Sequence, residues 1–349
     1  MIIKSPIEGA TLSLELKFER VLQKLKLNRF RPFPMMRGGF WQTIYGAYWP
    51  CLKAPKSDKL HTVLLPDGDA VTLVENRPKS WRLGKRIILL AHGACGSHES
   101  PYMERMARRL FYSGHLVLRM NFRTVGPGFG LSQKCYHGGV SDDTRAVLHW
   151  IDREFPGSPV TQVGFSLGGN ITLKMAGEDG SKPTGPLDSV VAVSPPVDLK
   201  AAIRKLGQPE NKLFEKMFLN SLKKDVERLH EKFPNLGPQK FPTELNVHMF
   251  DELYTAPRWG YPTVDDYYRE SSSLQYLPEI QVPTFVLCSI DDPVIDASSL
   301  LEAPVNKNID MLLTEHGGHV GFLGWGTRWD EVRWSDQAVT NWIDTTLVR

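Results

Sequence analysis

A serine between two glycines is the residue of this chain best suited to covalent chemistry. The pentapeptide GFSLG at 164–168 has the pattern Gly-X-Ser-X-Gly, follows the apolar run 160–163 and precedes the helix-forming run 171–176. A serine on such a sharp strand-to-helix turn exposes its hydroxyl at the end of a sheet, and the glycines remove side chains that would crowd the turn. The pattern alone is common in glycine-rich loops, but this position predicts that Ser166 is a nucleophile.

A carboxylate that could orient the base follows the apolar run 284–288. A serine hydroxyl is a weak nucleophile unless a base removes its proton, and the histidine that does so is held by a carboxylate. Asp291 and Asp292 lie where this run ends, and catalytic groups of open α/β sheets gather at the carboxyl ends of strands. We expect Asp292, directly before Pro293, to be the acid, with Asp291 as the alternative.

Two histidines follow the last apolar run, 309–313. We expect His319 to be the base, because Gly317 and Gly318 directly before it allow the loop to fold back toward the serine. His316 is the alternative. Either histidine gives the chain order serine, acid, histidine that accompanies this type of nucleophile turn.

Two backbone amides are candidates for an oxyanion hole, which binds the negative oxygen formed during acyl transfer. One belongs to Leu167, directly after the serine, at the N-terminus of the expected helix where the dipole favours an anion. The second follows the run 87–90, where a His-Gly loop begins at His92. We assign this second donor to Ala94 and expect His92 to brace the loop rather than act as a base.

The sequence offers no motif for a cofactor or a metal. The segment GPGFG at 126–130 would need a further glycine at Leu131 to match a dinucleotide loop, and no GxxxxGK[ST] phosphate loop occurs. The ten histidines show no HExxH spacing and the four cysteines no CxxC pair. We therefore expect neither a cofactor nor a metal. We expect the four cysteines to be free thiols.

The elements needed to position these residues recur along the chain. Short apolar runs alternate with amphipathic stretches, which is typical of a parallel sheet covered by helices on both faces. A hairpin around the Asp-Gly turn at 67–68 adds an antiparallel edge. The expected strands lie at 62–65, 71–74, 87–90, 116–118, 160–163, 190–193, 285–287 and 311–313, and the expected helices at 101–113, 142–154, 167–177 and 335–348.

Two segments fall outside this alternation. Residues 1–58, rich in basic and aromatic clusters, are expected to form an arm packed on a core made of residues 59–197 and 281–349. Residues 198–280 contain no run that resembles a buried strand, and we expect them to form a helical cap over the site. One helix of this cap carries an apolar stripe at helical spacing, formed by Phe214, Met217, Phe218, Leu222, Val226 and Leu229.

Composition narrows the possible partners. The 349 residues carry a net charge of only +3, which argues against an electrostatic nucleic-acid binder. Residues 200–240 hold ten Lys or Arg against five Asp or Glu, so the cap is locally basic; peripheral contact with lipid is a lesser possibility than internal packing. The N-terminus lacks the pattern of a secretory signal, and no apolar stretch is long enough to span a membrane. We expect a cytoplasmic protein.

Taken in order, these motifs resemble those of the YheT-type α/β-hydrolases, which include plant EMB8-like proteins and relatives of the mammalian ABHD group. The resemblance covers nearly the whole chain from about residue 29 onward. Its further pieces are Phe30-Arg31-Pro32, Gln42-Thr43-Ile44, Pro66-Asp67-Gly68, His92-Gly93, Ser100-Pro101-Tyr102, Asn121-Phe122-Arg123, Tyr136-His137-Gly138, Thr255-Ala256-Pro257, Asp266-Tyr267-Tyr268 and the segment 317–322.

The resemblance implies an α/β-hydrolase fold and a serine hydrolase that cleaves small carboxylic esters, with Ser166, Asp292 and His319 matching the family's triad. It favours short to medium acyl chains. The alternative is an acyltransferase that passes the acyl group to an alcohol, and a non-catalytic binding protein is the remaining possibility. The chain departs from the family at 124–127 and at Ala94-Cys95, which leaves the shape of the pocket open.

Overall fold

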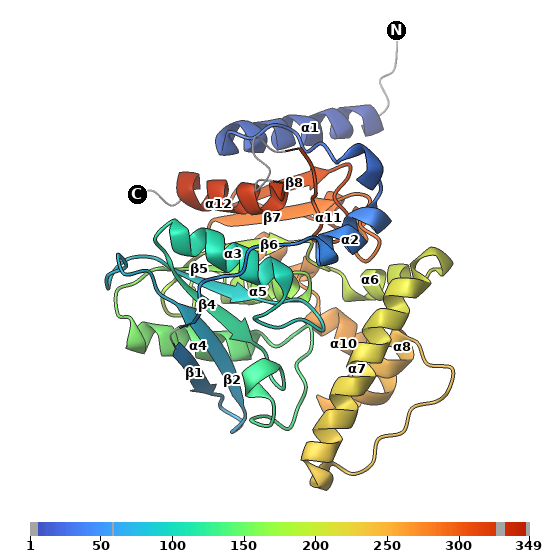
Figure 1. Cartoon of the computed structure of the whole chain (residues 1–349). Helices are drawn as coiled ribbons and strands as arrows, with labels where there is room; N and C mark the ends of the chain where they lie inside the picture. Colours follow the sequence, from blue (N-terminus) through green and yellow to red (C-terminus); the bar gives the residue numbers. More distant parts are fainter. Residues whose placement is uncertain (1–5, 58, 326–331, 347–349) are drawn as a thin grey trace.

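The computed structural model describes residues 6–57, 59–325 and 332–346, and its centre is one eight-stranded sheet (Figure 1). The strand order is β1-β2-β4-β3-β5-β6-β7-β8. β2 is antiparallel to β1 and β4, and the remaining pairs are parallel, which confirms the expected sheet and its antiparallel edge. The strands are β1 (Lys59–Leu64), β2 (Ala70–Asn76), β3 (Ile87–Ala91), β4 (Leu116–Asn121), β5 (Val160–Phe165), β6 (Leu187–Val193), β7 (Thr284–Ser289) and β8 (Ile309–Thr314).

Both faces of the sheet are buried, because alternate side chains of each strand point into different cores. In β3, Ile88 belongs to a core shared with α1, α3 and α12, and Leu89 belongs to a core shared with α4 and α5. The helices over the sheet are α1 (Pro6–Leu25), α3 (Pro101–Tyr112), α4 (Ser141–Glu154), α5 (Leu167–Asp179), α11 (Ser298–Leu301) and α12 (Trp334–Thr346). The expected helices on both faces are confirmed; the end of the last one, at 347–348, lies outside the described residues.

The first part of the chain packs along the β8 side of the sheet. α1 lies against β8 and α12 (Figure 1). Its Leu25 is fully buried in a core shared with both elements. The chain then passes through a short 3-10 turn, η1 (Pro34–Met36), into α2 (Gly39–Tyr48). Residues 1–5 and 58 of the predicted arm lie outside the described residues.

Between β6 and β7 the described chain contains helices and no strand. The longest helix, α7, projects away from the sheet (Figure 1). Of its predicted apolar stripe, Phe214, Val226 and Leu229 are buried, whereas Met217 is 43% exposed. The elements are α6 (Leu199–Leu206), η3 (Pro209–Asn211), α7 (Lys212–Lys232), η4 (Pro234–Leu236), α8 (Val247–Phe250), the π-helical turn η5 (Asp251–Thr255), α9 (Ala256–Arg258), α10 (Val264–Ser271) and η6 (Leu274–Glu279).

A buried arginine ties the antiparallel edge to the rest of the sheet. Arg123, just after β4, pairs with Asp143 at 2.7 Å and with Asp69 at 2.8 Å. It also pairs at 2.6 Å with Asp67 in the turn between β1 and β2. A buried charge is tolerated only when it is paired in this way, so the cluster fixes the loop after β4 relative to the hairpin. A second 3-10 turn, η2 (Gly126–Gly128), continues this loop.

Candidate active site

Ser166 lies on a strained turn between β5 and α5. Its backbone has φ 50° and ψ −122°, a region that non-glycine residues rarely adopt. The turn is tight: a Cβ at Gly168 would overlap the carbonyl oxygens of Ala91 and His92, and a Cβ at Gly164 would overlap that of Gly168. Strain of this kind costs about 1–3 kcal/mol and persists where the surroundings enforce it. The turn therefore presents the Ser166 hydroxyl at the carboxyl end of the sheet.

Three of the predicted residues meet at this point. The Ser166 hydroxyl lies 2.8 Å from Nε2 of His319, and Nδ1 of His319 lies 2.9 Å from Oδ2 of Asp292. Asp292 is fully buried, and its other oxygen accepts the backbone N–H groups of Val294 and Ile295 at 2.8 and 2.9 Å. The carboxylate is thus held from one side by the backbone and faces the imidazole with the other.

The two alternative residues form a separate pair nearer the surface. Asp291 accepts Nδ1 of His316 at 3.2 Å, and its other oxygen accepts the backbone N–H of Gly318 at 2.9 Å. The His316 side chain is 42% exposed, against 10% for His319. In this arrangement Asp291 supports the loop that carries His319, and in the described residues neither it nor His316 forms a hydrogen bond to Ser166.

Helix α2 holds the histidine loop from the opposite side. The Thr43 hydroxyl accepts the backbone N–H of His319 at 2.8 Å and donates to the carbonyl of Gly39 at 2.7 Å. A side chain at Gly39 would overlap the carbonyl oxygen of Asp291, and one at Gly46 would come within 2.6 Å of Gly321. The two glycines therefore allow α2 to approach both loops of the site closely.

The loop after β3 places one of its amides beside the serine. The N–H of Gly93 donates to the Tyr102 hydroxyl at 3.0 Å, and the N–H of Cys95 donates to the Tyr136 hydroxyl at 2.8 Å. Between them, Ala94 lines the same cavity as Ser166 and Leu167. Among the described residues no hydrogen bond occupies the N–H of Ala94 or of Leu167, so both predicted donors are available to a ligand.

His92 is built into this loop as a neutral side chain. It is fully buried, its Nδ1 lies 2.7 Å from the carbonyl of Gly93, and its Nε2 accepts the backbone N–H of Phe122 at 3.3 Å. Burial lowers its pKa to about 4, although the bond to Gly93 acts in the opposite direction. In the described residues its ring forms hydrogen bonds to Gly93 and Phe122 and none to Ser166, so it is placed to brace the loop.

Thr43, Tyr102 and Tyr136 belong to the site although the sequence does not predict a role for them. All three donate or accept hydrogen bonds that fix the loops of the site. The signal available in the sequence was their position within motifs shared with the resembled family, at 42–44, 100–102 and 136–138. Those motifs marked the positions without indicating the bonds.

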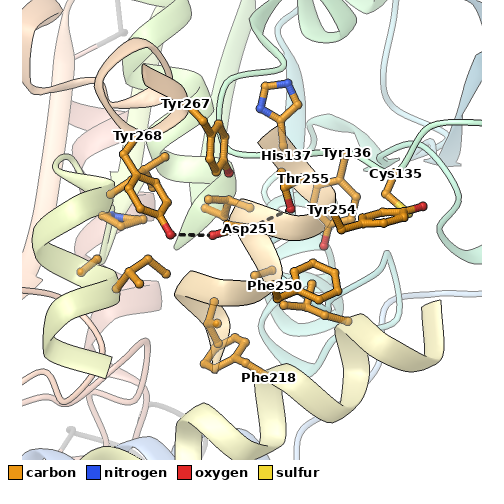
Figure 2. A pocket seen from close by; sticks show the side chains of 18 of the residues that line it. Cys135, Tyr136, His137, Phe218, Phe250, Asp251, Tyr254, Thr255, Tyr267 and Tyr268 are labelled. Carbon is orange, nitrogen blue, oxygen red and sulfur yellow. Dashed lines mark hydrogen bonds between the residues drawn. The ribbon is translucent and has the colours of Figure 1, made fainter. Parts of the chain in front are cut away.

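A cavity of about 150 Å³ has Ser166 in its lining. Figure 2 shows other side chains that line it, among them Phe218 and Phe250. Its lining from the 198–280 segment is mostly apolar and includes Leu199, Ile203, Phe218, Leu222, Val226 and Phe250. A void of this size with an apolar lining accommodates a molecule about as large as benzene. The cavity can thus take a small apolar group close to the serine.

One buried carboxylate also lines this cavity. Asp251 accepts the Thr255 hydroxyl at 2.7 Å and the Tyr268 hydroxyl at 3.0 Å, as Figure 2 shows. Burial raises its pKa to about 6, against the two hydroxyl bonds that lower it. Asp251 forms no ion pair in the part of the chain that is described, and the two side chains that bond to its carboxylate are hydroxyls.

Comparison with known proteins defines the class to which this fold and site belong. Residues 86–324 match the model of the α/β hydrolase fold family. Among solved structures, an esterase of Pyrococcus furiosus, Pf2001, aligns over 84% of this chain and 98% of its own with a TM-score of 0.54 at 16% identity. At that identity the likeness concerns the fold, which is that of the α/β-hydrolases.

The particular branch follows from a sequence relative. YheT of Escherichia coli (strain K12), an esterase by name, is 32% identical over 288 residues, which cover 81% of this chain and 84% of YheT. The chain belongs to the YheT-type α/β-hydrolases. Mouse phospholipase ABHD3 is 29% identical over 240 residues, covering 68% of this chain and 58% of the mouse protein. In the described residues no helix combines the length and apolarity needed to cross a bilayer.

Proposed function

We propose that this protein is a serine hydrolase that cleaves carboxylic esters through an acyl-enzyme on Ser166. The observation that carries the proposal is the continuous chain of hydrogen bonds from Ser166 through His319 to the buried Asp292, at 2.8 and 2.9 Å. It is supported by the match to the α/β-hydrolase family and by relatives that are named esterases.

In the first half of the proposed reaction, Ser166 Oγ attacks the acyl carbon while Nε2 of His319 takes the hydroxyl proton. Asp292 holds the imidazole in the tautomer that can accept this proton and stabilises the resulting cation. The N–H groups of Ala94 and Leu167 receive the negative oxygen, and the N-terminus of α5 adds its dipole. Removing one such donor typically costs about 100- to 1000-fold in rate. His319 then protonates the departing alcohol.

In the second half, water attacks the acyl carbon and gives its proton to His319. The ester bond to Ser166 breaks, the carboxylic acid leaves, and His319 returns the proton to the serine oxygen. The same two amides stabilise the second tetrahedral oxygen. No metal or cofactor takes part in this scheme.

The acyl group is proposed to occupy the cavity between the core and the 198–280 segment. The apolar lining favours an acyl chain over a charged group, and the small volume favours short to medium chains. We accordingly propose that residues 198–280 act as a cap and that residues 1–58 form an arm on the core made of 59–197 and 281–349.

The proposal is tested by labelling with a fluorophosphonate and by turnover of p-nitrophenyl esters of increasing acyl length. We expect stoichiometric labelling and ester turnover, both lost in Ser166→Ala and retained in the matched control Ser113→Ala, which alters an exposed serine at the end of α3. Unchanged labelling or turnover in Ser166→Ala would refute the mechanism.

Acyl transfer to an alcohol is a second candidate. A yeast relative, 26% identical over 275 residues, is named a medium-chain fatty acid ethyl ester synthase/esterase, and this chain spans 60% of its length. Both outcomes use the same acyl-enzyme and differ only in whether water or an alcohol attacks it. Product partition between acid and new ester at increasing ethanol separates the two: a new ester that predominates over the acid at low ethanol identifies a transferase.

A further inference from the structure

Helix α2 presents an aromatic face to the solvent. Trp41, Tyr45 and Tyr48 are spaced by four and three residues, which places them on one side of the helix. Their exposed fractions are 49%, 39% and 71%. The opposite side of the same helix is buried at Gln42 and Gly46. Single exposed aromatic residues are ordinary on protein surfaces, but three on one helical face form a patch.

The chain around this helix is basic without any acidic residue. Residues 28–57 contain five Lys or Arg and no Asp or Glu. All five are exposed, and Arg29 pairs with Glu19 of α1. The ion pairs formed among the described residues include none with the remaining four, which are Arg31, Arg37, Lys53 and Lys56. Along the chain, the aromatic helix is thus flanked on both sides by exposed positive charge that forms no ion pair among the described residues.

The patch continues toward the cavity beside Ser166. The Phe40 ring lies 5.2 Å from that of Trp41 and 5.3 Å from that of Phe214 at the start of α7. Beside Phe214, the side chains of Leu213 and Met217 are 48% and 43% exposed. The same helix lines the cavity with Phe218 and Leu222. Apolar side chains therefore connect α2, through the buried Phe214, with the α7 residues that line the cavity.

We propose that the outer face of α2 docks on an anionic lipid surface. Trp and Tyr rings favour the boundary between headgroups and acyl chains, because one end of each ring is apolar and the other forms hydrogen bonds. Lys and Arg beside them are attracted to anionic headgroups. The helix itself carries no charge, so the rings would supply the apolar contact and the basic residues before and after the helix the attraction to anionic lipid.

Docking through the outer face of α2 would bring lipid close to the site around Ser166. The inner side of α2 carries Thr43, which holds the backbone of His319, so the docked helix is part of the frame of the triad. The link between docking and ester supply rests on the proposed function. Docking itself depends on the α2 face and not on Ser166.

The test is co-sedimentation of the full chain, carrying Ser166→Ala, with vesicles of phosphatidylcholine alone and of phosphatidylcholine with phosphatidylglycerol. We expect binding to the anionic vesicles that weakens at high salt. The triple variant Trp41→Ser, Tyr45→Ser, Tyr48→Ser should lose roughly tenfold or more in partition, and Arg31→Gln with Arg37→Gln should abolish the preference for anionic lipid. The matched control replaces three exposed side chains elsewhere, Leu64→Ser, Leu83→Ser and Tyr112→Ser, and should bind as the parent does.

Two outcomes would overturn the docking proposal: no binding of the parent to anionic vesicles, or equal binding of the aromatic triple variant and the control. The α2 face could instead bind a second copy of the chain, which sedimentation velocity without lipid tests. A dimer that dissociates in the aromatic triple variant would assign the face to self-association. Hydrolysis of a water-soluble ester, measured with Ser166 restored, should be the same in both triple variants. If neither the parent nor the variants hydrolyse the ester while the parent still binds anionic vesicles, the proposed function is contradicted and the docking proposal is not.

Discussion

The Thr43 hydroxyl accepts the backbone N–H of His319 at 2.8 Å, which joins residues 276 positions apart in the chain. Through this bond a helix that precedes the whole sheet sets the position of the histidine that faces Ser166. The loop is also held at Gly318, whose N–H donates to Asp291 and whose carbonyl accepts the Ser289 hydroxyl, both at 2.9 Å. Residues before β1 therefore belong to the frame of the proposed site.

Removing the Thr43 hydroxyl should slow catalysis without weakening substrate binding. Thr43→Val keeps the shape of the side chain but leaves the His319 N–H without its acceptor, so the imidazole can move away from Ser166. A displacement of about 1 Å costs up to about 100-fold, and we expect kcat to fall roughly 10- to 100-fold with little change in KM. Thr43→Ser, which retains the hydroxyl, serves as the control and should restore most of the activity. A rise in KM at constant kcat would contradict a positioning role.

Substitution of the two neighbouring aspartates should lower kcat to very different extents. Asp292→Asn replaces a buried carboxylate that faces His319, which favours the wrong imidazole tautomer, and a loss of about 10⁴-fold in kcat is expected. Asp291→Asn keeps an oxygen that can accept the Gly318 N–H, so we expect kcat to fall by less than about tenfold. Steady-state hydrolysis of a p-nitrophenyl ester by both variants measures the difference. Equal losses, or the larger loss in Asp291→Asn, would assign the acid to Asp291.

The serine turn was predictable because its signals are local. An apolar strand, a glycine pair around Ser166 and a helix-forming run follow one another within residues 160–176, and each has its own physical reason. The strands and helices of the sheet were equally readable, since each alternation of apolar and amphipathic segments is a short-range property. The positions of Asp292 and His319 followed from the rule that such groups lie after strands.

Contacts between distant segments were not readable in this way. Asp291 and Asp292 are adjacent and chemically identical, and only the conformation of their loop directs one toward His319 and the other toward His316. Thr43 holds His319 because α2 crosses the site closely at Gly39 and Gly46, and nothing in residues 39–48 by themselves indicates what they approach. Such pairings depend on tertiary packing rather than on local pattern.

Removing a hydroxyl that holds the loop after β3 should lower kcat. Tyr136→Phe removes the acceptor of the Cys95 N–H, which fixes the peptide next to Ala94. Because loss of a whole oxyanion donor costs about 100- to 1000-fold, a misaligned donor should cost less, roughly tenfold in kcat. The rate of fluorophosphonate labelling should fall in parallel. Tyr112→Phe, on the exposed surface of α3, is the control, and no difference between the two variants would exclude this role for Tyr136.

Asp251 should make the stability of the fold depend on pH. Burial raises its pKa from the ordinary 3.8 to about 6, so between these values the native state binds more protons than the unfolded chain does. The free energy of unfolding should therefore fall as pH rises from about 4 to about 6, by at most about 3 kcal/mol from this group.

Asp251→Asn removes the titration, and its stability relative to the parent should increase over this range and then level off. Urea unfolding at several pH values measures the effect, with Glu252→Gln, an exposed neighbour in the same π-helical turn, as the control. A difference between Asp251→Asn and the parent that stays constant with pH would show that Asp251 titrates alike in the folded and unfolded chain.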